Sequence, residues 1–316
     1  MELRTVGRSG LQVSRTGLGT MTWGRDTDEY EARDQFGLFL EAGGTVFDTA
    51  DVYGSGAAEE LLGTLVAEAG VRDEVVLVTK AGGRRTTQRR FDTSRRQLLA
   101  ALDGSLERLG TDYVDLWLVH GWDDVTPIEE TLAALSYAVA SGRTRYVGVS
   151  NFRPWQLARA ATLAAGAGAA GAPLVANEVE YSLLARRDEA DALGAAHAVG
   201  AGLLAWSPIG RGVLTGKYRH GTPADSRGAS PHLGGFVGEY LSADHRRVVD
   251  AVCTAAEGLG VAPIDVALAW VRDRPGVSSV LLGSRTAAQL RGALRAEELT
   301  LPDEIRAALD EVSAPA

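Results

Sequence analysis

Four residues that can carry protons stand at or just beyond the ends of short apolar runs. Asp48, Lys80 and His120 each end such a run, and Tyr53 follows Asp48 by five residues in a loop with glycine. In a parallel barrel the carboxyl ends of the strands form the catalytic face. The spacing therefore predicts that an Asp, a Tyr, a Lys and a His converge on an acid–base site.

Each residue also has an ordinary structural explanation when taken alone. An Asp at a strand end often caps a helix or closes a turn, and a Lys there is usually solvated. A lone His on an apolar strand and a Tyr at a barrel rim are often packing residues. All four structural explanations would have to hold together, in this order along the chain, so the functional interpretation is favoured.

The elements that must position these residues alternate in a regular rhythm. Segments of helical period separate short apolar runs that are nearly continuous, as expected of strands covered on both faces. This alternation indicates βα units on a parallel sheet. The runs are Thr45–Asp48, Val75–Lys80, Asp115–His120, Val147–Ser150, Leu174–Glu178, Gly202–Trp206 and Val280–Gly283.

The ends of the chain and one long connection add to this pattern. Leu3–Val6 and Leu11–Val13 flank a Gly-Arg-Ser-Gly turn and predict a hairpin before the barrel. Gly216–Gly238 has no apolar period and is too long for an ordinary connection, which indicates a functional or mobile loop. No composition shift marks a boundary, so we expect a single domain over residues 1–316.

Composition excludes several classes of protein. The 316 residues include 41 acidic and 32 basic side chains, for a net charge of −9, which argues against a general nucleic-acid surface. An anionic ligand must therefore meet a local cationic pocket. The one cysteine, Cys253, excludes an intrachain disulfide and a cysteine-rich metal site, and we expect no metal. Without an N-terminal apolar segment or a long apolar run, we expect a cytoplasmic protein with no membrane or nucleic-acid partner.

A set of short motifs resembles the aldo-keto reductase superfamily over essentially the whole length. None is specific alone, but together and in order they are. The resemblance implies a (β/α)8 TIM barrel with extra C-terminal helices and loops, and hydride transfer between a nicotinamide and a carbonyl. The matching segments are Gly17–Met21, Phe47–Gly54, Thr79-Lys80, Asp115–His120, Gly148–Phe152, Glu180–Leu184, Ser207–Gly212, Leu214–Tyr218 and Gly283–Thr286.

The resemblance assigns Tyr53 as the general acid of carbonyl reduction, with Asp48, Lys80 and His120 as the other members of a tetrad. The chemistry is consistent with this. A free phenol has a pKa of about 10 and keeps its proton at neutral pH. A neighbouring ammonium stabilises the phenolate that remains after proton donation. Asp48 would hold that ammonium, and His120 would orient the carbonyl oxygen or share the proton relay.

The same resemblance implies NADP(H) as the cofactor. Ser150 and Asn151 would bind the nicotinamide carboxamide, and Trp206 would stack on the ring. The pyrophosphate would lie against Ser207, Ile209, Gly210, Arg211 and Lys217. The adenosine 2′-phosphate end would lie against Ser284, Arg285 and Gln289. The full set of implied cofactor residues is Gly19, Thr20, Met21, Ser150, Asn151, Glu178, Trp206, Ser207, Ile209, Gly210, Arg211, Lys217, Gly283, Ser284, Arg285 and Gln289.

Two positions depart from the family. Glu178 stands where a Gln is usual, which places a carboxyl group beside the carboxamide. An ionised Glu178 would favour the oxidised nicotinamide ring, whereas a buried Glu178 would stay protonated. Ala293 replaces an Asn that often contacts adenine. Trp23 and Trp122 are expected in the substrate pocket, which suggests an apolar or ring-stacking carbonyl substrate.

Three other functions remain open at this point. The chain could reduce a nucleotide-linked keto-deoxysugar or another biosynthetic intermediate. It could be a cofactor-sensing regulatory subunit on the same fold. It could also be a hydrolase that uses Asp48 and a second carboxylate on the same barrel, in which case it would not bind NADPH. Neither the substrate nor the oligomeric state can be inferred from the sequence.

Overall fold

Eight parallel strands close into a barrel in this computed structural model, which describes residues 1–84, 89–187 and 189–315. Each strand pairs with the next along the chain, and the last pairs with the first, in the order β10-β3-β4-β5-β6-β7-β8-β9. The predicted TIM barrel is confirmed. The barrel strands are β3 (Thr16–Gly19), β4 (Val46–Asp48), β5 (Val76–Ala81), β6 (Val114–Val119), β7 (Thr144–Ser150), β8 (Leu174–Glu180), β9 (Gly202–Trp206) and β10 (Val277–Leu282).

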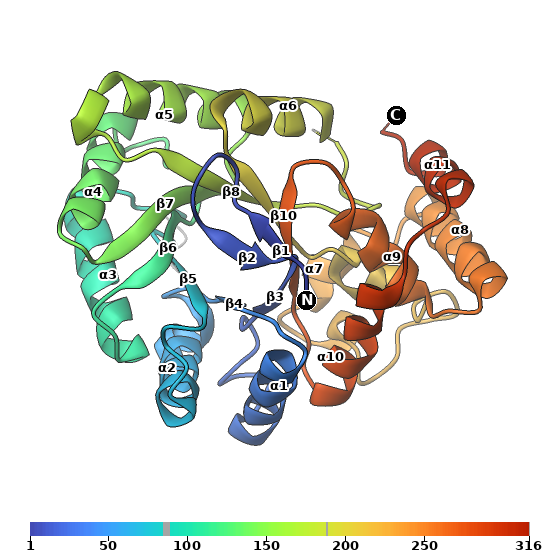
Figure 1. Ribbon diagram of the computed structural model, residues 1–316. Helices are drawn as coiled ribbons and strands as arrows, with labels where there is room; N and C mark the ends of the chain where they lie inside the picture. The colour runs from blue at the N-terminus through green and yellow to red at the C-terminus, as the bar shows by residue number, and fades with distance from the viewer. Residues whose placement is uncertain (85–88, 188, 316) are drawn as a thin grey trace.

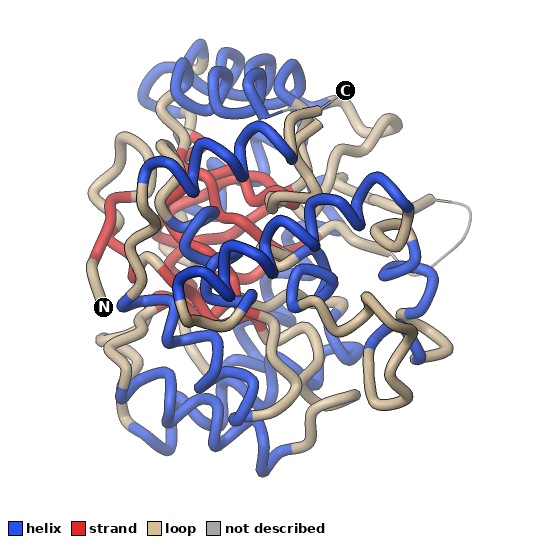
Figure 2. The backbone as a smooth tube through the Cα atoms, turned by 90° about the vertical axis from the view of Figure 1, so that its right-hand side faces the viewer, coloured by secondary structure: helices blue, strands red, loops and turns tan. Residues whose placement is uncertain are grey.

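Helices surround the barrel, so the strands lie inside a shell of helices in both views (Figures 1 and 2). Their ends follow the capping chemistry of the sequence. The Asp28 side chain accepts the backbone N–H of Glu31 at the start of α1, and Gly110 ends α3 in a left-handed conformation. The helices of the first half are α1 (Glu29–Glu41), α2 (Ala57–Ala69), α3 (Arg95–Leu109), α4 (Ile128–Ala140), α5 (Pro154–Gly166) and α6 (Glu189–Val199).

The C-terminal half carries extra helices beyond the barrel repeat, as the resemblance implies. In the described chain three helices lie between β9 and β10 and two follow β10, where the repeat needs one at each place: α7 (Gly234–Gly238), α8 (Ala243–Leu259) and α9 (Pro263–Arg272), then α10 (Ala287–Leu294) and α11 (Asp303–Val312). In the part of the chain that the structure describes, no helix alone is long and apolar enough to cross a membrane. Among the described helices, only α8 and α9 taken together, bent by 103° at their junction, reach that length and composition.

The predicted hairpin forms and packs on the inside of the barrel. β1 (Leu3–Thr5) pairs antiparallel with β2 (Gln12–Ser14), with Arg4 opposite Val13. Figure 1 shows the hairpin lying across the strands. Val6 and Val13 are almost fully buried and belong to the same apolar cluster as barrel side chains such as Leu116 and Leu204. The hairpin thus fills one end of the barrel and leaves the carboxyl ends of the strands for the site.

The first barrel strand is the one that the apolar runs did not predict. β3 contains Gly17 and Gly19 and has few apolar side chains. A Cβ atom on Gly17 would lie 2.7 Å from a methyl carbon of Leu281 and 3.1 Å from one of Val46, so the close packing of β10 and β4 favours glycine here. The strand is specified by a packing constraint from the far end of the chain.

Candidate active site

The four predicted acid–base residues come together at the carboxyl ends of adjacent strands. Asp48 is the last residue of β4, Lys80 lies near the end of β5 and His120 follows β6 directly. Tyr53 begins the short helix η1 (Tyr53–Gly56) that follows β4. Because β4, β5 and β6 are neighbours in the barrel, these side chains share one side of a cavity, beneath which Lys80 is fully buried.

Lys80 is held by three oxygen atoms. Its Nζ lies 2.5 Å from Oδ1 of Asp48, donates to the carbonyl oxygen of Thr49 at 2.9 Å and lies 3.3 Å from Oε2 of Glu178. Burial alone would lower the pKa of Lys80, but the charges of the two carboxyl groups outweigh burial and raise this pKa above its usual value. Lys80 is therefore a permanent ammonium inside the site.

Tyr53 and His120 face this ammonium as neutral groups. The Nζ of Lys80 lies 5.2 Å from the centroid of the Tyr53 ring, and the Tyr53 and His120 rings are 6.0 Å apart in an edge arrangement. Burial raises the pKa of Tyr53 above its usual value, against the opposing charge of Lys80. Burial, with the charges of Lys80 and Arg90, lowers the pKa of His120 to about 3. At neutral pH the phenol keeps its proton and the imidazole is uncharged.

Glu178 joins this cluster from the opposite side of the barrel. It lies on β8, is 2% exposed, and its Oε2 atom accepts no hydrogen bond within the described part of the chain. Burial and the neighbouring Asp48 raise the pKa of Glu178 to about 8, while Lys80 acts in the other direction. Burial also raises the pKa of Asp48. The single ammonium group of Lys80 therefore faces two carboxyl groups, those of Asp48 and Glu178.

The cavity has a volume of about 680 Å³, which suits a sizeable organic ligand. It runs from Asp48, Tyr53 and His120 to the segment after β10 and reaches Ala293. Fourteen of the residues implied as cofactor contacts line it: Gly19, Met21, Ser150, Asn151, Glu178, Trp206, Ser207, Ile209, Arg211, Lys217, Gly283, Ser284, Arg285 and Gln289.

Two other implied cofactor residues lie behind the cavity wall. The backbone N–H and hydroxyl of Thr20 both donate to the carbonyl oxygen of Asp48, at 2.8 and 3.1 Å. Gly210 is buried with a φ of +54°, and its N–H donates to the carbonyl oxygen of Ser207. Both residues hold neighbours that do line the cavity.

The polar wall between β7 and β9 is built on strained backbone. Asn151 and Ser207 have φ values of +58° and +51°, a backbone conformation that residues other than glycine rarely adopt. The Asn151 amide donates to the carbonyl oxygen of His120 at 3.1 Å and accepts from the indole N–H of Trp206 at 3.1 Å. This network fixes the indole at the cavity wall.

Arg211 has protein partners on every side. Its guanidinium makes two hydrogen bonds to the Glu180 carboxylate, at 2.7 and 2.6 Å, and one to Glu239 at 2.8 Å. It also lies 3.7 Å from the centroid of the Phe236 ring. Although Arg211 lines the cavity, these carboxylates already balance its charge, so the role inferred for it from the sequence must involve shaping the wall as well.

Three cations at the end of the cavity away from Tyr53 have no carboxylate partner among the described residues. Among the described residues, no carboxylate lies within 4 Å of Lys217, Arg227 or Arg285, whereas most other arginines have one. Arg285 donates to the carbonyl oxygen of Asp225, and Arg227 donates to that of Gly283. Burial and the charge of Arg285 lower the pKa of Arg227. This end of the cavity is suited to an anion.

The two tryptophans expected in the substrate pocket are not among the described residues that line this cavity. Trp23 is fully buried in the apolar core, and Trp122 packs edge-on against Phe152 and Trp155, with ring centroids 5.2 and 5.3 Å away. Neither contributes to the wall of this cavity as formed by the described residues. Phe236 does, from the long loop, where it stacks 6.4 Å from Trp206. It follows two glycines in a segment without apolar period, which left no signal for it in the sequence.

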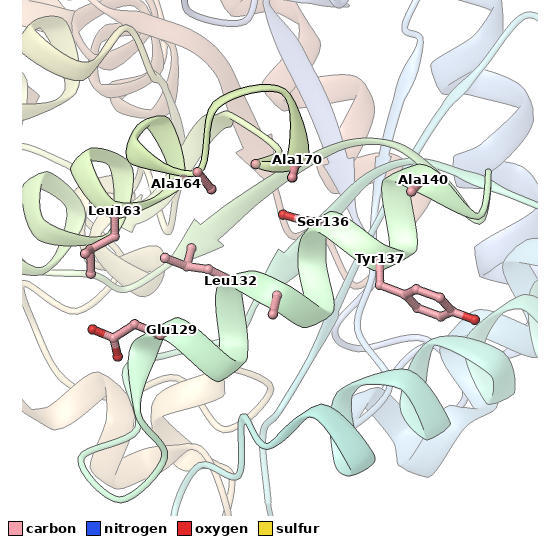
Figure 3. Close-up of a pocket in the computed structure, with 11 residues that line it drawn as sticks. Glu129, Leu132, Ser136, Tyr137, Ala140, Leu163, Ala164 and Ala170 are labelled. Atoms are coloured by element: carbon pink, nitrogen blue, oxygen red, sulfur yellow. The ribbon is translucent and has the colours of Figure 1, made fainter.

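A second cavity, of about 510 Å³, lies on the outside of the barrel between α4 and α5. Figure 3 shows its labelled side chains, mostly small or apolar, coming from these two helices and the turn after α5, among them Leu132, Ser136 and Ala164. Glu129 and Tyr137 are its titratable residues. Its described lining residues form no cluster of groups for proton transfer, so the larger cavity is the candidate active site.

Comparisons with known proteins show the family of the chain. The family model of the aldo/keto reductase family matches residues 15–314, and the chain belongs to this family. It is 36% identical to an uncharacterized oxidoreductase, YrpG, of Bacillus subtilis (strain 168), over 99% of this chain and 96% of the relative.

Two plant relatives have names of a different kind. A probable voltage-gated potassium channel subunit beta of Oryza sativa subsp. japonica is 37% identical over 90% of this chain and 87% of its own length. A protein of the same name from Arabidopsis thaliana is 35% identical over 95% of this chain and 92% of its own length.

Proposed function

We propose that the chain is an NADP-dependent oxidoreductase that reduces an aldehyde or ketone to an alcohol, with Tyr53 as general acid. The observation that carries this proposal is the neutral phenol beside a permanent ammonium, at the wall of a cavity large enough for a cofactor and a small substrate. Family membership supports the class of reaction.

The cavity residues fit a nicotinamide dinucleotide phosphate. Its phosphates would meet Lys217, Arg227 and Arg285, none of which has a carboxylate within 4 Å among the described residues, and its ring would meet Trp206 at the other end. When bound, the nicotinamide supplies the hydride. The 2′-phosphate of NADP, rather than NAD, is proposed because Arg285 lies next to Ser284 and close to Gln289, whose side chain accepts the backbone N–H of Arg285 at 3.0 Å.

The chain's own residues handle the proton. Tyr53 holds it until the carbonyl oxygen gains negative charge, and Lys80 stabilises the phenolate that remains. Asp48 and the Thr49 carbonyl oxygen fix the ammonium. The neutral imidazole of His120 lines the cavity and can hydrogen-bond the substrate oxygen. We propose a small carbonyl compound as substrate and the cytoplasm as the place of action.

Fluorescence titration with NADPH and NADH, followed by turnover of a panel of aldehydes and ketones, tests this proposal. Tight NADPH binding and turnover of at least one carbonyl class are expected. Failure to bind either cofactor would contradict the proposal and favour the hydrolase alternative, which needs only the pair of carboxyl groups.

A cofactor-sensing regulatory role is the second candidate, and the names of the two plant relatives favour it. It requires the same cavity and the same cofactor. NADPH binding without turnover of any carbonyl in the panel, including nucleotide-linked keto-deoxysugars, would favour the regulatory role over the enzyme.

A further inference from the structure

The cluster of Asp48, Lys80 and Glu178 has one more carboxyl group than it has cations. With both carboxyl groups ionised, it would bury a net negative charge, and an uncompensated buried charge is costly. Tyr53 and His120, which border the cluster, are neutral and do not compensate it. One proton is therefore retained by the carboxyl pair.

Geometry indicates which group retains it. Asp48 lies 2.5 Å from the ammonium of Lys80, and Glu178 lies 3.3 Å from it. Asp48 thus makes the closer ion pair. The Oε2 atom of Glu178 is buried at the cavity wall and accepts no hydrogen bond in the described chain. Glu178 is the carboxyl group whose environment best tolerates a neutral, protonated form.

The other elements packed around Glu178 bring no second cation to it. From β7, the Ser150 hydroxyl donates to the backbone carbonyl oxygen of Glu178 at 3.1 Å. On the same strand, Glu180 is committed to Arg211. Among the described residues, Lys80 is the only cation within 4 Å of the Glu178 carboxyl group. A positive charge arriving in the cavity would therefore act on Glu178 strongly.

We propose that Glu178 is a proton switch that responds to the redox state of the cofactor, protonated beside the neutral reduced ring and ionised beside the cationic oxidised ring. This inference rests on the proposed function, because the ring must lie near Tyr53 to react. On ionisation the O–H bond of the carboxyl group breaks, the electron pair stays on the carboxylate, and the proton leaves to solvent. Binding of the oxidised cofactor thus releases a proton, whereas binding of the reduced cofactor does not.

Proton release by the wild-type protein is the direct test. NADP+ or NADPH is mixed with the protein near pH 7 in weak buffer with an indicator dye. We expect NADP+ to release a fraction of a proton per site that approaches one, and NADPH to release much less. The infrared C=O stretch of a protonated carboxylic acid should weaken on NADP+ binding. Both readouts are independent of turnover.

A matched pair of variants assigns the proton. Glu178→Gln keeps the shape of the side chain and should abolish both the release and the infrared change. Asp115→Asn removes a partly buried carboxyl group near the start of β6, where it accepts the N–H of Leu77 at 2.9 Å, and should retain both. The 2′-phosphate is common to both redox forms, so its own titration cancels in the comparison.

Affinity gives a second, independent readout. The ratio of NADP+ to NADPH affinity should rise between about pH 6 and pH 9 in the wild type, by about tenfold for each unit by which the Glu178 pKa falls on binding. In Glu178→Gln the ratio should be flat. Equal proton release with both cofactors, or release that survives in Glu178→Gln, would overturn the switch. If neither cofactor binds at all, the proposed function fails as well.

Discussion

Tyr53 differs from an ordinary surface tyrosine through its neighbours. Its neighbours are a buried ammonium, two carboxyl groups and a neutral imidazole. His120 could act as an acid comparable to Tyr53 only as a charged imidazolium. Its pKa of about 3 keeps His120 uncharged at neutral pH. We therefore expect the Tyr53 hydroxyl, and not His120, to donate the proton.

Tyr53→Phe tests that expectation. The ring and its packing remain, so NADPH affinity should be nearly unchanged. Turnover should fall by about a hundredfold to ten-thousandfold, the usual contribution of a general acid. Steady-state kinetics and a fluorescence titration on the same preparation measure both quantities. Near wild-type turnover would show that another group supplies the proton.

Arg285 provides the second prediction at this scale. Hydrogen bonds to charged groups are worth about 1.5–3 kcal/mol, so Arg285→Ala should weaken NADPH by about one to two decades and leave NADH almost unchanged. Arg291→Ala, on the exposed side of α10, is the control and should affect neither. Equal losses for both cofactors would mean that Arg285 does not contact the 2′-phosphate.

At the scale of elements, the packing of α2 against α3 depends on the absence of a side chain at Gly63. A Cβ atom there would lie 2.6 Å from the backbone carbonyl of Leu109. Gly63→Ala should therefore destabilise the fold by about 1–3 kcal/mol, the usual cost of overpacking.

Gly37 on α1 is the matched control for this prediction. It has nothing within 4 Å of its Cβ position, and Gly37→Ala should stabilise the fold by up to about 1 kcal/mol through helix propensity. Thermal unfolding of both variants measures the contrast. A change of the same sign in both would contradict the packing argument.

Packing between segments far apart in the chain limits how much of the structure the sequence could predict. Strands such as Gly202–Trp206 are apolar runs and were predicted to the residue, because local composition specifies them. β3 was not, because Gly17 packs against Leu281, which lies far away in the chain. Motif positions placed most cofactor candidates at the cavity, whereas Phe236 and Arg227 reach it through a loop whose path no local pattern encodes.

At the scale of the whole molecule, buried carboxyl groups make stability depend on pH. The pKa of Glu178 is raised to about 8 and that of Asp51 to about 7, by burial and by neighbouring Asp48 and Glu59 respectively. Between their unfolded pKa values, near 4, and these folded values, the native state binds more protons than the unfolded state. Their contribution is therefore present at low pH and is lost as pH rises.

His120 acts in the opposite direction, but only below its unfolded pKa of about 6.5. The two carboxyl groups thus dominate between about pH 6.5 and pH 8. The free energy of unfolding should fall across this window, by up to about 1.4 kcal/mol per pH unit for each group. Asp51→Asn should reduce the slope. Urea denaturation at several pH values measures it, and a flat or rising profile would contradict the assignment.

The pairing of β3 with β10 determines when the barrel can close during synthesis of the chain. Thr16 pairs with Val280 and Leu18 with Leu282, so the first barrel strand has an unpaired edge until almost the whole chain has been synthesised. Local βα units can form early, but the ring closes only through this long-range contact, which is entropically slow. Asp48 lies on the strand beside β3, and Ser284 follows β10. The nascent polypeptide therefore acquires its complete binding cavity in the same late event that removes its last exposed sheet edges.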